Sequence, residues 1–261
     1  MQQKNYLRIC EKENNMANNS ASLSSEKFDD LLRCLSLLKE TCNDVDIREG
    51  VVRQRTNDNT TVFEIDLSPI LDNLTIPMTA LKQKLDLFKC FQGNDIEITT
   101  KEDNFTISDQ YSTIKIMYPT LEFMDNKFMS KEEINSIYTL DENDLILEVD
   151  ISKTISDRMR SITQGFNVTT VQVLFEEEKA AISAKTQSKD QYAKFLGDIT
   201  TERVLNSSSN LVVIPFVVDH DNNIQLKMFN YKDNGCINEF RTSISNVDVT
   251  IYGRSALVST E

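Results

Sequence analysis

The sequence predicts an α+β fold made of two similar halves, and three observations lead to this prediction. Short runs of alternating apolar and polar residues, with turn residues between them, indicate antiparallel β-strands. Two longer segments, which begin at Ser24 and at Ile151, repeat their apolar residues with the period of an α-helix. The same order of helical and alternating segments occurs in both halves of the 261 residues. A chain of this length is expected to hold roughly one to two domains.

The first half is expected to begin with a flexible N-terminal arm, residues 1–20, because this stretch is polar, rich in Asn and without either period. A helix should follow, with Ser24 or Ser25 as its N-cap. Its inward stripe is formed by Phe28, Leu31, Leu32, Leu35 and Leu38. Strands of an antiparallel meander are expected at Val45–Arg48, at Val51–Arg55 and from Thr60.

A second helix is expected after Pro77, because Pro is favoured in the first turn of a helix, and Gly93 should close it. Its inner stripe is formed by Leu81, Leu85 and Phe88. A hairpin pattern then runs from residue 94 to 119 and completes a first domain, residues 21–125. The following apolar residues are scattered among charges, which predicts an interdomain connector, residues 126–143.

The second domain, residues 144–261, is expected to repeat the first. Its strands should cover 145–150, 168–175 and 179–186, and its helix 151–166. Phe28, Leu32 and Leu35 correspond to Ile155, Met159 and Ile162 at a constant offset of 127, and Asp95–Thr99 corresponds to Asn223–Lys227 at an offset of 128. Two offsets that differ by one indicate an internal duplication. Residues 211–226 break the repeat, because β-branched residues and a turn replace the second helix.

The composition excludes several classes of enzyme. The chain has six Gly and neither of the glycine-rich phosphate-binding motifs. Its single histidine, His220, removes most catalytic triads and multi-histidine metal sites. Asp219, Asp221 and Asn223 have the spacing of a calcium loop, but Ile224 replaces the required Gly and Asn230 the required Glu. We therefore expect a polar turn with an exposed His220, no catalytic residues, no metal and no cofactor.

Cysteine usage and hydropathy indicate an intracellular protein. The five Cys residues are odd in number and have no C-x-x-C spacing, so reduced and mostly buried thiols are expected. The sequence contains neither an apolar run of the ~18 residues needed to span a membrane nor the apolar segment of a signal peptide. A cytoplasmic location without a membrane partner is expected.

The net charge of -13, from 41 acidic and 28 basic residues, opposes a surface that grips nucleic acid from outside. This rule concerns the total charge only. A chain that is acidic overall can still present a local basic surface, so the positions of Lys and Arg decide the question.

The order of elements resembles the DNA polymerase sliding clamps, the family of proliferating cell nuclear antigen, and among them the clamps of tailed bacteriophages. The segment LSSEKFDDLLRCLSLL, followed by DVDIREGVVRQRTNDNTTVFEIDL, is similar to the opening helix and strands of a phage clamp. NDIEITTKEDNFTISDQYSTIKIMYP is similar to the hairpin that ends its first domain. The resemblance covers residues 22 to about 258 and implies the DNA clamp fold: two similar domains of antiparallel sheets with inner helices, which form a ring.

The resemblance implies that the inner helices present basic residues to DNA in the channel. The candidates for phosphate contact are Arg33, Lys82, Lys89, Lys153 and Arg160. The first helix also carries Glu26, Asp30 and Glu40 on the same face, so it is not clearly basic. The alternative is a solvated helical face of mixed charge.

The resemblance also implies a hydrophobic pocket beside the connector, where short peptides of polymerases and loaders dock. The residues at the corresponding position are Phe128, Met129, Ile134, Ile137, Tyr138 and Tyr252. Alternatively, these side chains only pin the connector to the sheets.

The function that follows is a non-enzymatic processivity factor. In this interpretation a homotrimer encircles duplex DNA without reading its sequence, is loaded by a clamp-loader ATPase, and tethers the replicative DNA polymerase. If a phage encodes it, the protein acts in the cytoplasm of the host cell. The alternative function is a duplicated α+β structural or assembly protein of a phage particle, and a metal-dependent hydrolase that uses Asp219 or Asp221 is a weaker third.

Overall fold

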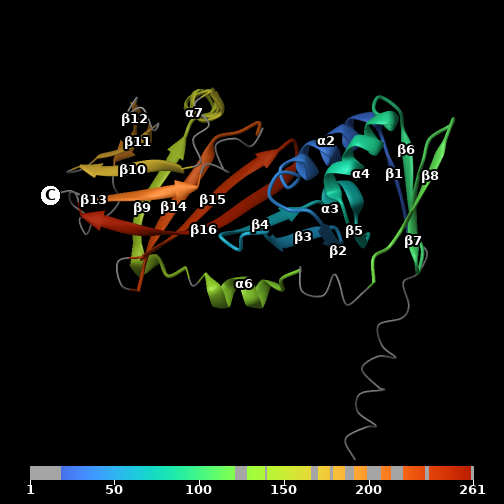
Figure 1. The fold of residues 1–261 in the computed structure, drawn as a ribbon, viewed down its shortest axis with the longest axis horizontal. Helices are drawn as coiled ribbons and strands as arrows, with labels where there is room; N and C mark the ends of the chain where they lie inside the picture. The colour runs from blue at the N-terminus through green and yellow to red at the C-terminus, as the bar shows by residue number, and fades with distance from the viewer. Residues whose placement is uncertain are drawn as a thin grey trace, which may run out of the picture.

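The computed structural model describes residues 19–120, 128–138, 140–165, 170–176, 179–185, 191–198, 207–212, 220–232 and 235–259 (Figure 1). Most of the expected N-terminal arm lies outside these residues. Cys10, Phe166 and residues 213–219, which include Asp219, also lie outside them. Residues 213–219 belong to the segment that is expected to break the repeat.

The first half contains the two predicted helices. Helix α2 spans Ser25–Ser36, and its N-cap Ser24 accepts a hydrogen bond from the backbone N–H of Lys27 at 3.4 Å. Helix α4 spans Leu81–Phe88. The strands are β1 (Asn19–Leu23), β2 (Val45–Arg48), β3 (Val51–Arg55), β4 (Thr61–Asp66), β5 (Ile76–Met78), β6 (Ile96–Thr100), β7 (Asn104–Ser108) and β8 (Thr113–Met117), with short helices α3 (Ser68–Leu71) and η1 (Lys89–Phe91).

Two expectations for this half are wrong. The arm does not reach residue 20, because strand β1 begins at Asn19 and pairs with β6. Pro77 does not start a helix; it lies in β5 opposite Asp46 of β2. Strand β5 is the edge of its sheet, a place where the missing N–H of Pro costs no ladder hydrogen bond. Helix α4 begins four residues later, after Ala80, which has a left-handed φ of 51°.

The connector and the second half follow. The short helix α6 (Lys131–Ile137) lies within the expected connector, and helix α7 (Lys153–Gly165) corresponds to the helix predicted from Ile151. The strands are β9 (Leu145–Ile151), β10 (Thr170–Glu176), β11 (Lys179–Lys185), β12 (Gln191–Asp198), β13 (Ser207–Val212), β14 (Ile224–Tyr231), β15 (Gly235–Ile244) and β16 (Val247–Ser259), with the turn η2 (Glu142–Asp144).

Strand pairing repeats in the two halves. In the first half β1 pairs with β6, β6 with β7 and β7 with β8, and in the second half β9, β14, β15 and β16 pair in the same order. The meander β2–β3–β4 with β5 beside β2 likewise has its counterpart in β10–β11–β12 with β13 beside β10. The two halves therefore share one topology, as the sequence offsets predict, while the exact domain boundaries stay a prediction.

A continuous sheet joins the halves. Strand β16 of the second half pairs with β4 of the first, from Val249 opposite Ile65 to Gly253 opposite Thr61. Helices α2, α4 and α7 lie on one side of the strands, and α6 lies on the opposite side (Figure 1).

The predicted helical stripes form the core. Phe28, Leu31, Leu32, Leu35 and Leu38 are buried together with Leu81, Leu85 and Phe88 in one cluster that includes strand residues of both halves. On α7 the buried face is shifted: Met159 is buried and Ile155 and Ile162 are only partly so, while Ser156 and Thr163 are buried. Polar residues on an inner helical face are invisible to a search for apolar periodicity.

Candidate functional sites

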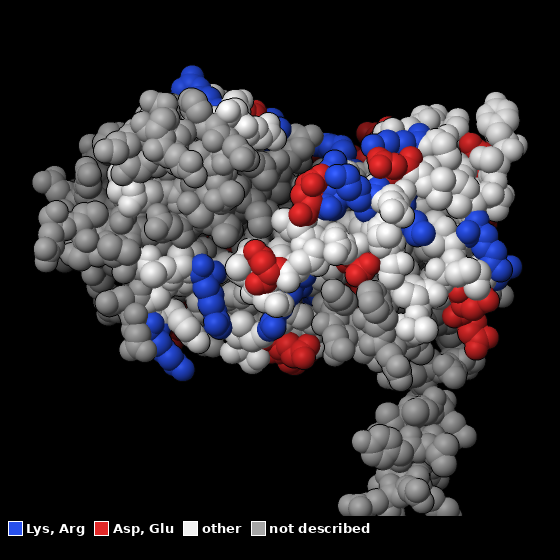
Figure 2. All heavy atoms as spheres, viewed as in Figure 1, with Lys and Arg blue, Asp and Glu red and all other residues white. Residues whose placement is uncertain are grey.

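The helical side of the molecule carries basic and acidic side chains close together. Over α2 and α4, Lys and Arg lie among Asp and Glu (Figure 2). Lys82 of α4 and Lys89, the first residue of η1, are both exposed. Lys82 lies 3.9 Å from Glu40 and Lys89 lies 2.7 Å from Asp86. Such exposed pairs contribute little energy, so both ammonium groups remain accessible to an anion.

The predicted cations of α7 are less exposed. Lys153 donates to the backbone carbonyl of His220 at 2.7 Å and lies 3.6 Å from Asp157. The Arg160 side chain is 22% exposed and pairs with Asp157 at 3.3 Å. Arg158 of the same helix is exposed. Because the buried face of α7 is shifted, Arg158 is one of the outward-facing cations of this helix.

Arg33 connects the two halves. Its guanidinium lies 2.8 Å from Asp221, in the turn before β14, and 3.5 Å from Asp30 of its own helix. Hydrogen bonds from Arg33 and from the backbone N–H of Ser245 hold the pKa of Asp221 below its usual range. The Ser245 hydroxyl donates to Asp30 at 2.6 Å. Arg33 therefore helps to join α2 to the second half, and part of its charge is compensated there.

The expectation of an exposed His220 is wrong. His220 is completely buried, and its Nε2 lies 2.6 Å from the Ser156 hydroxyl of α7. Its Nδ1 contacts the carbonyl oxygen of Asn222, which favours a proton on Nδ1 and leaves Nε2 as the acceptor. Ser156 is also completely buried, so no substrate reaches this Ser–His pair. Its role is to fix the start of β14 against α7.

The opposite side of the sheet carries α6. Its first turn is fixed by a capping box, in which Ser130 and Glu133 bond each other's backbone N–H groups. Met129, Ile134 and Tyr138 are buried against the strands, and the ring of Tyr138 stacks on Tyr252 with 5.3 Å between centroids.

All six residues of the predicted peptide pocket lie in this region. Met129, Ile134, Tyr138 and Tyr252 are buried and Ile137 is partly buried in one cluster, which also includes Val62, Phe229 and Ile237. Phe128 lies beside it, with the Arg48 guanidinium 4.7 Å from its ring centroid. These contacts hold α6 against the sheet, and a role of the six residues in peptide binding stays a prediction.

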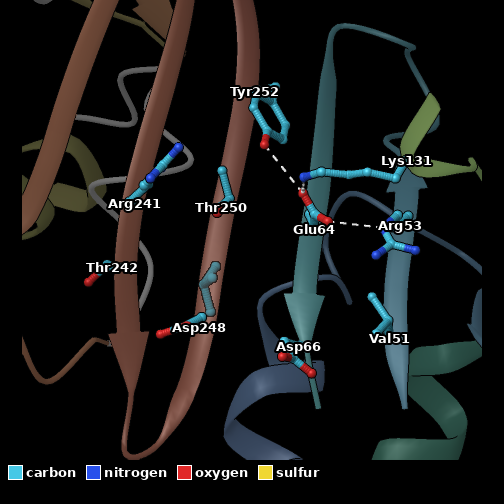
Figure 3. Close-up of a pocket in the computed structure, with 11 residues that line it drawn as sticks. Val51, Arg53, Glu64, Asp66, Lys131, Arg241, Thr242, Asp248, Thr250 and Tyr252 are labelled. Carbon is cyan, nitrogen blue, oxygen red and sulfur yellow. Dashed lines mark hydrogen bonds and ion pairs between the residues drawn. The ribbon is translucent and has the colours of Figure 1, made fainter. Parts of the chain in front are cut away.

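A polar groove of about 440 Å³ lies beside the N-terminus of α6 (Figure 3). We call it the junction groove. Its lining residues come from both halves and from α6: Val51, Arg53, Glu64, Asp66, Lys131, Arg241, Thr242, Asp248, Val249, Thr250 and Tyr252. Apart from Tyr252, none of them is in the predicted pocket. Strand alternation gives only part of the set, because the polar members occupy every second position of β4 and of β16 but not of β15, where Arg241 and Thr242 are adjacent.

Glu64 organises one end of the junction groove. It accepts hydrogen bonds from Arg53 at 2.9 Å, Lys131 at 2.5 Å and the Tyr252 hydroxyl at 3.3 Å. Burial opposes ionisation of Glu64, but the bonds from Lys131 and Arg53 outweigh it and hold its pKa below the usual range. Burial, together with the nearby Glu64 charge, raises the pKa of Tyr252. At neutral pH the carboxylate is therefore ionised and the phenol is neutral.

Three further features of the described residues are the state of the cysteines, the grouping of metal-ligand residues and the hydropathy of the helices. Cys34, Cys42 and Cys236 are buried free thiols, and burial raises the pKa of Cys34 and of Cys236 to about 12, whereas Cys90 is exposed. The described part of the chain holds no group of three or more His, Cys, Asp or Glu residues that could bind a metal ion. Among the same residues, no helix has both the length and the apolar character needed to cross a membrane.

Comparisons with known proteins identify the fold. No protein-family model and no curated protein sequence matches the chain. Solved structures do match: a PCNA from Entamoeba histolytica is 13% identical with a TM-score of 0.62, over 92% of this chain and 98% of that one.

Two further structures extend the comparison. The PCNA from A. fulgidus, solved with the C-terminal region of FEN-1 bound, is 11% identical with a TM-score of 0.60, over 93% of this chain and 99% of that one. The Helicobacter pylori beta clamp, bound to a DNA ligase peptide, is 14% identical with a TM-score of 0.54, over 93% and 67%. The chain thus has the fold of the PCNA and beta-clamp structures, the α+β DNA clamp fold that its sequence predicts.

Proposed function

We propose that this chain is the subunit of a sliding clamp, a ring that encircles duplex DNA and tethers a replicative DNA polymerase. The observation that carries the proposal is the repeated strand pairing and the two edges that it leaves open. Within the chain, the third meander strand of the first half, β4, pairs with the last strand of the second half, β16. The equivalent strands, β12 and β8, each have one partner among the described strands.

Pairing β8 of one copy with β12 of the next would repeat the β16–β4 junction between chains. Such head-to-tail contacts generate a ring when the rotation closes. Two exposed apolar side chains, Tyr111 just before β8 and Met117 at its last position, are available to this contact. A homotrimer, which the resemblance to proliferating cell nuclear antigen implies, would then contain six similar domains.

The helical side would face the DNA. We propose that Lys82, Lys89, Lys153 and Arg160, with Arg33 in a weaker role because of its pair with Asp221, contact phosphates. A clamp retains DNA by topology, so loose contacts that ignore the base sequence allow sliding. The mixture of charges over α2 and α4 is compatible with this need, whereas a uniformly basic surface would bind DNA tightly.

The side that carries α6 would receive partner peptides. Structures of the same fold have been solved with a FEN-1 region and with a DNA ligase peptide bound. We propose that the region of Phe128, Met129, Ile134, Ile137, Tyr138 and Tyr252 positions such peptides from a polymerase and a clamp-loader ATPase. We further propose the tailed-phage type and a cytoplasmic site of action, that of the host cell for a phage protein.

A primer-extension assay tests the function. The cognate polymerase would be supplied with its loader, ATP and this protein on a primed circular template, with a large excess of trap DNA. The proposal predicts products lengthened by this protein only when loader and ATP are present. Product length that ignores this protein, together with a single-chain native mass, would contradict it and favour the structural-protein alternative.

A further inference from the structure

We infer that the junction groove selects partner peptides by two opposite charges, an acidic group at its Tyr252 end and a Lys or Arg at its Asp248 end. The inference rests on the proposed function and adds a charged surface beside the proposed peptide region, with which the groove shares Tyr252. It differs from an apolar pocket, because α6 already buries the apolar side chains of this region against the sheet.

The Tyr252 end of the junction groove presents cations to solvent. The Lys131 side chain is 43% exposed and that of Arg241 is 56% exposed. Their carboxylate partners lie beneath them: the Glu64 side chain is 15% exposed and that of Glu239 is 1% exposed. With Arg53, three cations surround two carboxylates, so this end has a net positive charge. An incoming carboxylate would meet Lys131 and Arg241 before their own partners.

The opposite end presents acids. Asp248, which begins the outward-facing row of β16, is exposed, and Asp66 of β4 is half-buried. Figure 3 shows Asp66 and Asp248 toward one end and Tyr252 at the other, with Thr250 between Asp248 and Tyr252 on β16 and opposite Arg241 on β15. Asp248 lies two strand positions from Thr250, the residue opposite Arg241, and four from Tyr252, which corresponds to roughly 7 and 13 Å. Since the long Lys131 and Arg241 side chains reach over part of this span, the two charges of the peptide should be about two to four extended residues apart.

A peptide in the junction groove would be recognised by side chains of the protein and not by hydrogen bonds to a strand edge. Strand β16 is paired on both sides here, with β15 through Thr250 opposite Arg241 and with β4 through Thr250 opposite Glu64. A peptide therefore has no open strand edge in the junction groove and lies on the face of the sheet. Charge placement then determines both its affinity and its direction.

Selection from a random dodecapeptide display library tests the inference on the full chain. The wild-type protein should enrich peptides with Asp or Glu two to four positions from Lys or Arg. Asp248→Lys, a change at an exposed side chain, should exchange the preferred basic residue for an acidic one. It should also weaken binding of the wild-type peptides by about tenfold or more. Glu102→Lys, at an exposed position in the β6–β7 turn, is the matched control with the same reversal of charge and should change neither.

Enrichment of apolar or aromatic peptides that bind Asp248→Lys equally well overturns the inference, and so does the absence of enrichment. Lys131→Gln provides a second variant, which should reduce the preference for the acidic residue. The same proteins are tested for retention on circular DNA. Charge-selected peptides on a protein that never encircles DNA would refute the proposed function but not the groove, whereas DNA retention without charge selection would refute the groove alone.

Discussion

At the scale of single residues, the polar groups of the inner side divide into two kinds. Arg33 and His220 make specific contacts across the molecule, to Asp221 and to Ser156 respectively. Lys82 and Lys89 are exposed and make only surface ion pairs. The helical wheel of α2 places Arg33 among the outward residues, but its partner is 188 positions away in the sequence. Only the tertiary fold reveals such a pair.

This division predicts that some substitutions change the stability of the protein and others change its DNA binding. Arg33→Gln should lower the free energy of unfolding by about 1 kcal/mol or less, because it removes a partly exposed ion pair between the halves. The double change Lys82→Gln and Lys89→Gln should alter it by less than about 0.5 kcal/mol, yet reduce the salt dependence of DNA retention. Urea unfolding and salt titration measure the two effects. An unchanged salt dependence in the double variant would contradict the assigned phosphate contacts.

The buried His220 predicts a pH dependence of stability. Burial lowers its pKa in the fold, and Lys153 and Arg160 add to the effect. The unfolded chain takes up the proton near pH 6.5, while the folded chain does so only at lower pH. The free energy of unfolding should therefore decline as the pH falls below about 6.5, and the loss is complete below the folded pKa.

Urea unfolding of the wild type and of His220→Gln, at about pH 7.5 and about pH 5.5, measures this contribution. The variant should be less stable at the higher pH and lose less stability between the two. A wild-type slope that equals the slope of His220→Gln would show that His220 does not titrate in this range.

At the scale of elements, local signals account for what the sequence predicts. Helix α2 combines an N-cap at Ser24 with a full apolar stripe, and the prediction is correct. Helix α6 has seven residues, too few for a period, although its capping box at Ser130 and Glu133 is a readable signal. Strand β1 is also short, and it is defined by its pairing with β6, which no local pattern indicates. The junction groove was missed because its residues come from four strands and α6, which no local pattern brings together.

Helix α6 should contribute strongly to stability through its residue Ile134, whose side chain is completely buried. Ile134→Ala should lower the free energy of unfolding by about 2–5 kcal/mol, the usual cost of truncating a large core side chain. The exposed neighbour Asn135 provides the control, since Asn135→Ala should be neutral or slightly stabilising. Equal stability of the two variants would mean that α6 does not pack on the sheet as described.

At the scale of the whole molecule, the exposed large apolar side chains predict where copies of the chain meet. Tyr111 lies just before strand β8 and Met117 is the last residue of that strand, whereas Leu87 lies on α4. Tyr111→Glu with Met117→Glu should convert the ring into single chains, because like charges and lost apolar contact weaken the interface. Leu87→Glu, with the same change of charge per residue, should preserve the ring. Native mass spectrometry distinguishes the two, and dissociation by Leu87→Glu alone would place the interface elsewhere.

The net charge of -13 can be interpreted only for the whole molecule. Basic residues lie on the side of α2, α4 and α7, and the total describes the molecule as a whole. A ring would enclose the side of α2, α4 and α7, where Lys and Arg lie among Asp and Glu, and the net negative charge of the whole chain would repel DNA that approaches from outside. The sequence predicts the fold and the inner helices, but the extent of each basic surface depends on ion pairs such as Arg160 with Asp157.

The claim that the chain encircles DNA is tested most directly by trapping the ring. Cysteines placed at Lys115 in β8 and Lys194 in β12, in a Cys10→Ser, Cys90→Ser background, would be joined by a bismaleimide after loading onto a nicked circular plasmid. The account predicts a covalent ring that stays on the circle in high salt and detergent and is released when the plasmid is linearised. Release from circular and linear DNA alike, or cross-linking that never closes a ring, would contradict it.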